Sequence, residues 1–199
     1  MSDPAHPVPY RSRPVEWTYD ARGSRWAAWM TEDQRFVAGR QDVLVWQTGR
    51  LTLDVRVAGN IVATLFASTT GSDADWAVKL IDVYPDDVKE RPEMGGYQLP
   101  IALDIMRGRY YQGWDKPAAI ASNMVTPFTV DLHQQAYTFK TGHRIMVQVQ
   151  STWFPLYDRN PQTYVPNIFE APATAYKVQT HRIARTPAQP SHVSIQVVR

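Results

Sequence analysis

The chain of 199 residues is 44% hydrophobic and contains no cysteine, which excludes disulfide bonds, thiolate metal sites and a thiol nucleophile. Its 21 basic and 19 acidic residues include no run of five or six like charges, so we expect no nucleic-acid partner. No stretch reaches the roughly 18 consecutive apolar residues of a membrane span, and the N-terminus lacks the apolar core of a signal peptide. We therefore also expect no membrane partner.

Residues 1–42 are expected to form an extended arm or linker. Proline recurs at its beginning, as in the run Pro7-Val8-Pro9, and each proline fixes its own φ and restricts the residue before it. The arm is rich in large rings, so we expect it to lie against a surface. These rings are Trp17, Tyr19, Trp26 and Trp29.

Residues 43–199 show the period-two alternation of strands that bury one face. Strands are predicted over 51–57, 61–68, 76–84, 97–105, 128–132, 145–149 and 193–197, with Gly59-Asn60 expected to form a turn between the first two. No helical period extends beyond a turn or two around 171–180. The pattern predicts an all-β fold, a sandwich or jelly roll.

Catalytic serines of the α/β-hydrolase type lie in a Gly-x-Ser-x-Gly turn between a strand and a helix. Ser24 and Ser72 each follow a glycine, but neither has the second glycine or a helix behind it. We interpret both as turn residues, so the sequence offers no catalytic residue of this type.

Asp73, Asp75 and Asp82 could contribute to a calcium site, since this cation prefers carboxylate and carbonyl oxygens. Turn capping by Asp73 and Asp75, and pairing of Asp82 with a basic side chain, is the interpretation we favour. The histidines show no metal-binding spacing, so no metal or other cofactor is expected. They are His6, His133, His143, His181 and His192.

A dense mixture of aromatic residues, prolines and charges occupies 151–161. Asp158 and Arg159 are expected to hold this loop through hydrogen bonds, because buried charges persist only when they are paired. The aromatic content of 12% also leaves a second interpretation open, in which exposed rings stack on sugars.

The segments 142–155 and 158–161 closely resemble a motif of the C-terminal domain of the X-prolyl dipeptidyl peptidase and cocaine esterase superfamily of serine hydrolases. The resemblance extends to 67–69, 73–85, 94–98 and 107–110, and to the arm. Through Asp75-Trp76, 94–97 and 164–169 it is closest to α-amino-acid ester hydrolases and glutaryl acylases. The motif residues expected to be structural are Asp75, Trp76, Arg144, Trp153, Phe154, Asp158, Arg159 and Asn160.

This resemblance implies a galactose-binding-domain-like jelly roll over 43–199, docked on an α/β-hydrolase domain that carries the serine, histidine and aspartate of the family. Those catalytic residues have no counterpart in this chain, so the chain alone is expected to be inactive. The arm would lie near the substrate cleft, with Pro9, Tyr10 and Trp17 contacting the substrate or the catalytic domain.

The sequence therefore favours an accessory domain that supports a hydrolase domain, its principal partner, and helps to shape its substrate cleft. Self-association through the same docking face is a further expectation. The alternatives are a free-standing carbohydrate-binding jelly roll and an enzyme with an unrecognised site. The compartment is left open, with periplasm or secretion considered for the parent enzyme.

Overall fold

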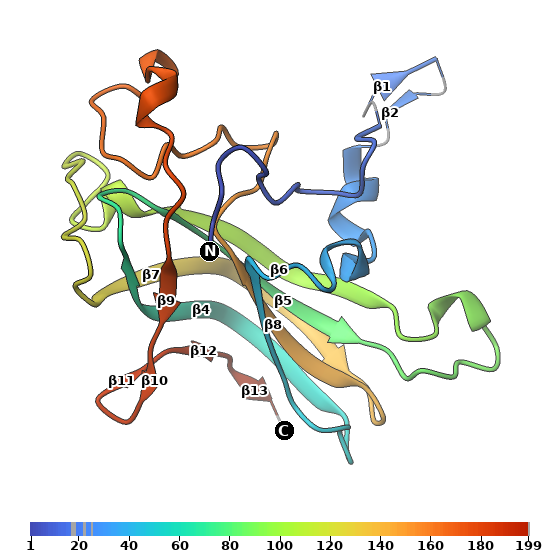
Figure 1. The fold of residues 1–199 in the computed structure, drawn as a ribbon. Helices are drawn as coiled ribbons and strands as arrows, with labels where there is room; N and C mark the ends of the chain where they lie inside the picture. The colour runs from blue at the N-terminus through green and yellow to red at the C-terminus, as the bar shows by residue number, and fades with distance from the viewer. Residues whose placement is uncertain (17–18, 22, 25, 199) are drawn as a thin grey trace.

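The computed structural model describes residues 1–16, 19–21, 23–24 and 26–198, and for Asp20 and Trp26 the backbone alone. Two larger antiparallel sheets dominate it (Figure 1). The first has the order β3 (Val43–Gln47), β8 (Arg144–Gln150), β5 (Asp75–Val83) and β6 (Gln98–Arg107). In the second, β4 (Val55–Thr69) pairs with β7 (Thr126–Phe139), β9 (His181–Ile183), β12 (His192–Ser194) and β13 (Val197–Val198).

The remaining elements are short. Two small hairpins pair β1 (Tyr19–Asp20) with β2 (Gly23–Ser24) and β10 (Arg185–Thr186) with β11 (Gln189–Pro190). The 3₁₀ helices are η1 (Trp26–Thr31), η2 (Gln34–Val37), η3 (Pro92–Met94), η4 (Gly108–Tyr110), η5 (Ile168–Glu170) and η6 (Ala173–Ala175). No α-helix occurs in the part of the chain that the structure describes. The predicted all-β jelly-roll sandwich is confirmed.

The main core lies between the two sheets. Trp76, Val78 and Leu80 share the inner face of β5, as the alternation predicts, and belong to one buried cluster with Phe128 and Leu132 of β7. The rings of Trp76 and Phe128 lie 5.4 Å apart. Large rings supply much of the apolar area that a core removes from water, so this pair links the two sheets.

The strand β5 is buried on both faces, since all nine of its residues are buried. Its inner face meets the core, while Ala77 and Lys79 of its outer face lie beneath the N-terminal arm. Figure 1 shows the blue arm, with η1 and η2, on the side of this sheet that faces away from β4 and β7. The arm therefore forms a third layer over the sandwich.

The predicted turn at Gly59-Asn60 is wrong. β4 runs unbroken from Val55 to Thr69 opposite β7, and the register shifts between Asn60 and Val62. Gly59 has a φ of +119°, a conformation that glycine adopts without strain and that a β-bulge can absorb within a continuous strand. The predicted strand residues before 55 lie outside β4, and Leu53 is 75% exposed.

Gly71 offers a test of how tightly the loop after β8 packs on the turn after β4. A Cβ atom there would lie 2.2 Å from the backbone oxygen of Gln162, so Gly71→Ala should lower the free energy of unfolding by about 1–3 kcal/mol. Urea unfolding measures the loss. Gly49→Ala is the control, because nothing lies within 4 Å of its Cβ position. Equal stability of the two variants would contradict the packing described.

Candidate functional site

The arm is held on the outer face of β5 and β6 by an aromatic cluster. The ring of Trp29 lies 5.5 Å from that of Tyr10 and 5.9 Å from that of Trp153, in edge-on geometry in both cases. Ala77 and Ile105 form the floor beneath them. We call these five residues the arm cluster. Rings at such distances and angles attract each other beyond the area they bury.

Backbone hydrogen bonds fix the arm next to the loop that follows β8. The amide of Tyr10 donates to the carbonyl of Phe154 at 2.9 Å, and the amide of Phe154 donates to the carbonyl of Val8 at 3.3 Å. Pro9 thus forms a short parallel bridge with Phe154. Trp153 also stacks on Tyr157, with ring centroids 6.1 Å apart, so the cluster continues towards the half-buried side chains of the loop.

An ion-pair network ties this loop to the first sheet. Arg107, at the end of β6, contacts Asp158 at 2.6 Å and Asp75 at 3.3 Å. Asn160 donates to the second oxygen of Asp75 at 2.9 Å. Burial raises the pKa of Asp75 to about 6, despite the neighbouring Arg107. The loop, β5 and β6 are therefore joined through one buried carboxylate.

Arg159 connects the same loop to the start of the chain. Its guanidinium donates to the carbonyl of Pro4 at 3.1 Å and lies 5.1 Å from the ring of Tyr176 and 5.9 Å from that of Phe154. A planar cation over ring faces is stabilised by the ring quadrupole. Arg159 therefore joins the arm, the loop after β8 and the segment around η6.

The structure brings together most, but not all, of the residues singled out from the sequence. Pro9, Tyr10, Trp153 and Phe154 meet in or beside the arm cluster, and Asp75, Asp158, Arg159 and Asn160 hold the loop next to it. Trp76 points to the opposite face of β5, into the core. Arg144 lies at the other end of β8, 3.7 Å from Asp86. Trp17 lies outside the described residues.

Lys79 is a buried residue of this site that sequence reasoning missed. It lies in the middle of β5, is fully buried, and donates to Oε1 of Gln34 in the arm at 2.7 Å. Its ammonium group also lies 5.6 Å from the ring centroid of Phe36. Desolvation by burial lowers the pKa of Lys79 to about 7. The signal that could have found it is a charged residue in the centre of a strand, directly between the apolar residues Val78 and Leu80.

The acidic side chains considered for calcium are dispersed and paired. Asp73 binds Arg109 at 2.6 Å, and Asp82 accepts from Tyr137 at 2.7 Å and lies 2.9 Å from His143. Asp73 also accepts from the amide of Ala74, whereas the turn-capping expectation fails for Asp75, which binds Asn160 and Arg107 instead. No group of three metal-ligating side chains is found among the described residues. Nor does any helix in that part of the chain have the length and apolarity to cross a membrane.

Comparison with known proteins gives consistent matches over the whole chain. The family model described as X-Pro dipeptidyl-peptidase C-terminal non-catalytic domain matches residues 16–194. Cocaine esterase of Rhodococcus sp. (strain MB1 Bresler) is 34% identical over 202 residues, which span 100% of this chain and 32% of the esterase.

Solved structures of larger enzymes contain the same fold. An aminopeptidase from the marine sediment archaeon Thaumarchaeota archaeon is 52% identical with a TM-score of 0.96, over 100% of this chain and 32% of the aminopeptidase. An α-amino acid ester hydrolase is 51% identical with a TM-score of 0.94, over 99% of this chain and 32% of the hydrolase. The chain thus spans about a third of the length of these relatives.

Lys79 predicts a pH dependence of stability. Because its pKa is lowered from 10.5 to about 7 in the folded chain, the unfolded state binds more protons above pH 7. The free energy of unfolding of the wild type should then rise from pH 7 to pH 9, relative to Lys79→Met, by up to about 1.4 kcal/mol per pH unit. Urea unfolding at each pH measures this difference. Lys140→Met, which removes an exposed lysine, should keep the rise; a wild type parallel to Lys79→Met would contradict the prediction.

Proposed function

Because the chain belongs to the family of X-Pro dipeptidyl-peptidase C-terminal non-catalytic domains, we propose that it supports the catalytic domain of a serine hydrolase and helps to shape its substrate cleft. The names of its relatives, an aminopeptidase, an α-amino acid ester hydrolase and a cocaine esterase, suggest ester or amide substrates for the whole enzyme. Its chemistry would be acyl transfer to water through an acyl-enzyme on the catalytic domain.

The observation that carries this proposal is the docked arm. We infer that residues 1–42 are the linker from the catalytic domain and that 43–199 are the jelly roll proper. Tyr10 is only 7% exposed, so in our proposal it fixes the path of the arm and meets the neighbouring domain by its edge, beside Pro9. Trp17 is proposed to extend the same contact.

The alternative, a carbohydrate-binding module, would depend on a row of exposed rings. The most exposed rings among the described residues are Tyr19, Trp114 and Phe169, at 69%, 72% and 85%. They belong to three separate segments of the chain, and Trp114 packs on Tyr110 at 5.5 Å. This arrangement gives the carbohydrate alternative less support than the arm gives the accessory role.

A chimera tests the proposal directly. The chain would replace the corresponding third of the α-amino acid ester hydrolase to which it is 51% identical. We expect the chimera to hydrolyse α-amino acid esters and to react with a fluorophosphonate probe at the serine of its catalytic part, whereas the isolated chain reacts with neither. The truncated hydrolase without a C-terminal third is the control. Stoichiometric labelling of the isolated chain, or a chimera no more active than the truncated enzyme, would contradict the proposal.

The role of the arm is tested by two tryptophan substitutions in that chimera. Trp153→Ala removes the central ring of the arm cluster and should lower kcat/KM at least tenfold, because the arm is no longer held at one position. Trp114→Ala removes a ring that is 72% exposed and should change kcat/KM less than twofold. Equal effects of the two substitutions would show that the arm cluster has no specific role.

A further inference from the structure

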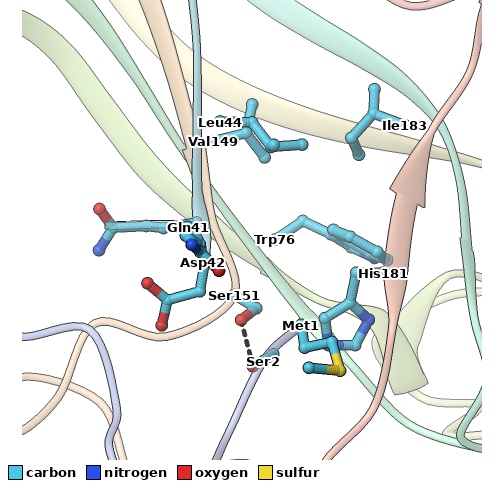
Figure 2. Close-up of a pocket in the computed structure, with 11 residues that line it drawn as sticks. Met1, Ser2, Gln41, Asp42, Leu44, Trp76, Val149, Ser151, His181 and Ile183 are labelled. Carbon is cyan, nitrogen blue, oxygen red and sulfur yellow. Dashed lines mark hydrogen bonds between the residues drawn. The ribbon is translucent and has the colours of Figure 1, made fainter. Parts of the chain in front are cut away.

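A cavity of about 200 Å³ lies between the two sheets at one edge of the sandwich. The edge strand β3 and its neighbour β8 line it from the first sheet, and β4, β9 and β12 line it from the second. A smaller pocket of about 110 Å³ shares Val149 and Ile183 with it, and Figure 2 shows these two side chains on the side away from Met1 and Ser2. The arm cluster lies on the opposite face of the first sheet, so the cavity is separate from it.

The cavity lies where the edge of the second sheet is interrupted. On this edge β4 pairs with β12 up to Thr64 and with β9 from Ala67 onwards, which leaves Leu65 and Phe66 between the two ladders. The chain that connects β9 to β12 turns away there as the hairpin of β10 and β11. The amide of Phe66 donates instead to the hydroxyl of Ser191 at 2.9 Å. A side chain thus takes the place of a strand, and the sandwich stays open beside Leu65.

Most of the wall of this cavity is apolar. Six side chains form this part, namely Trp46, Leu65, Val147, Val149, Ile183 and Val193. Four of the six pack against the main core but are only half-buried, although they point between the sheets; these are Trp46, Val147, Ile183 and Val193. Contact with a further apolar group would remove their remaining surface from water. An apolar cavity of about 150 Å³ is enough to take up benzene, so this one has room for a body of about six carbons.

The three polar side chains of the wall offer hydrogen-bond donors. Arg185 lies with its guanidinium 5.5 Å from the ring centroid of Trp46, which holds it beside the cavity. It forms no ion pair among the described residues. Ser191 accepts from the amide of Phe66, so its O–H is left to donate. His192 donates through Nδ1 to a backbone carbonyl at 2.7 Å, which leaves its Nε2 as an acceptor in the neutral ring and as a donor in the protonated one.

The charge of the surrounding strands favours an anion at this place. β3, β4, β8, β9 and β12 contain no acidic residue, and three of them carry an arginine. The segment 171–199, which includes Arg185, also contains basic residues and no acidic one. Asp42, which precedes β3, is paired with Arg40 at 2.7 Å. A negative group beside Arg185 would therefore meet a cation without a competing carboxylate from these strands, whereas a positive group would be repelled.

From these observations we propose that the cavity binds a small monocarboxylate with a compact apolar body of about six carbons. The body would lie between Trp46, Val147 and Ile183, and the carboxylate would accept from Arg185 and Ser191 at the wall. Charge-assisted hydrogen bonds from a guanidinium to a carboxylate are strong and directional. A single carboxylate also leaves no second charge to be buried among the apolar side chains.

This site does not depend on the proposed function, and it is tested by ligand binding alone. The test uses the 199-residue chain with cyclohexanecarboxylate as the probe and cyclohexylmethanol as its neutral counterpart. The methyl resonances of Val147, assigned with Val147→Ile, should shift saturably with the carboxylate, with a dissociation constant on the order of 1 mM. Val147 lines this cavity and not the smaller pocket beside it. Those of Ile81, which packs on the other face of β5, should not shift.

The two compounds separate recognition of the charge from burial of the ring. Cyclohexylmethanol should bind roughly fivefold more weakly than the carboxylate, because it makes no charge-assisted bond with Arg185. Acetate, which has the charge without the ring, should give no saturable shift of Val147. Equal affinity for the carboxylate and the alcohol, or a shift that grows linearly with the carboxylate, would overturn the proposal.

Two exposed arginines supply matched variants. Arg185 lines the cavity, whereas Arg182 of β9 does not, and neither forms an ion pair among the described residues. Arg185→Gln should weaken binding of the carboxylate roughly fivefold and leave binding of cyclohexylmethanol unchanged. Arg182→Gln should leave both unchanged. Equal weakening of the carboxylate by the two substitutions would contradict recognition by Arg185.

A crystal structure of the wild-type chain grown with cyclohexanecarboxylate gives an answer that does not depend on how the variants fold. We expect the ring between the two sheets, in contact with Val147 and Ile183, and the carboxylate within hydrogen-bond distance of Arg185. Ordered waters alone in the cavity, or an apolar side chain of a second copy seated in it, at a probe concentration well above millimolar, would overturn the proposal.

Discussion

The structure depends on one strand, β5, that is buried on both faces. A sandwich strand usually leaves one face to water, but here the outer face is covered by the arm and by the loop after β8. Apolar area on that face is removed from water only when both segments are in place. The order of the arm and the integrity of the first sheet are therefore coupled, and the N-terminal segment is part of the folded unit rather than a tail.

We infer that the buried charged groups under this third layer, Asp75 and Lys79, contribute more to the choice of one arrangement of the covering segments than to the free energy of unfolding. Removing a carboxylate or an ammonium group from water costs several kcal/mol, which pairing repays only when the geometry is good. Asp75 has that geometry, with Arg107 and Asn160 as partners. The hydrogen-bond partner of Lys79 is the neutral side-chain amide of Gln34. The pKa of Lys79 is lowered because this bond does not fully offset the cost of removing the ammonium group from water. Both residues select one position of the covering segments, because any shift would leave a buried polar group unpaired.

How far the sequence predicts this arrangement differs from element to element. The alternation of apolar and polar residues predicted the bounds of β6 and β8 to within two residues, because each strand has a regular inner and outer face. It failed at Gly59, where the same residue type serves turns and bulges and only the partner strand β7 decides between them. The loop residues Asp158 and Asn160 were expected to be structural, but their partners, Arg107 for Asp158 and Asp75 for Asn160, depend on contacts between distant segments that no local pattern contains.

An arm that is already ordered changes the energetics of its contact with a neighbouring domain. Fixing the backbone of a flexible residue costs about 1–2 kcal/mol. If the arm were ordered only on contact with the neighbouring domain, this cost would reduce the net free energy of that contact. In this chain the arm cluster and the bridge between Pro9 and Phe154 supply the ordering from within. A catalytic domain would then meet a preformed surface. The more rigid the arm is, the more closely the jelly roll would define the position of the substrate cleft. Rigidity of Tyr10, rather than its exposure, is thus the property that an accessory role requires.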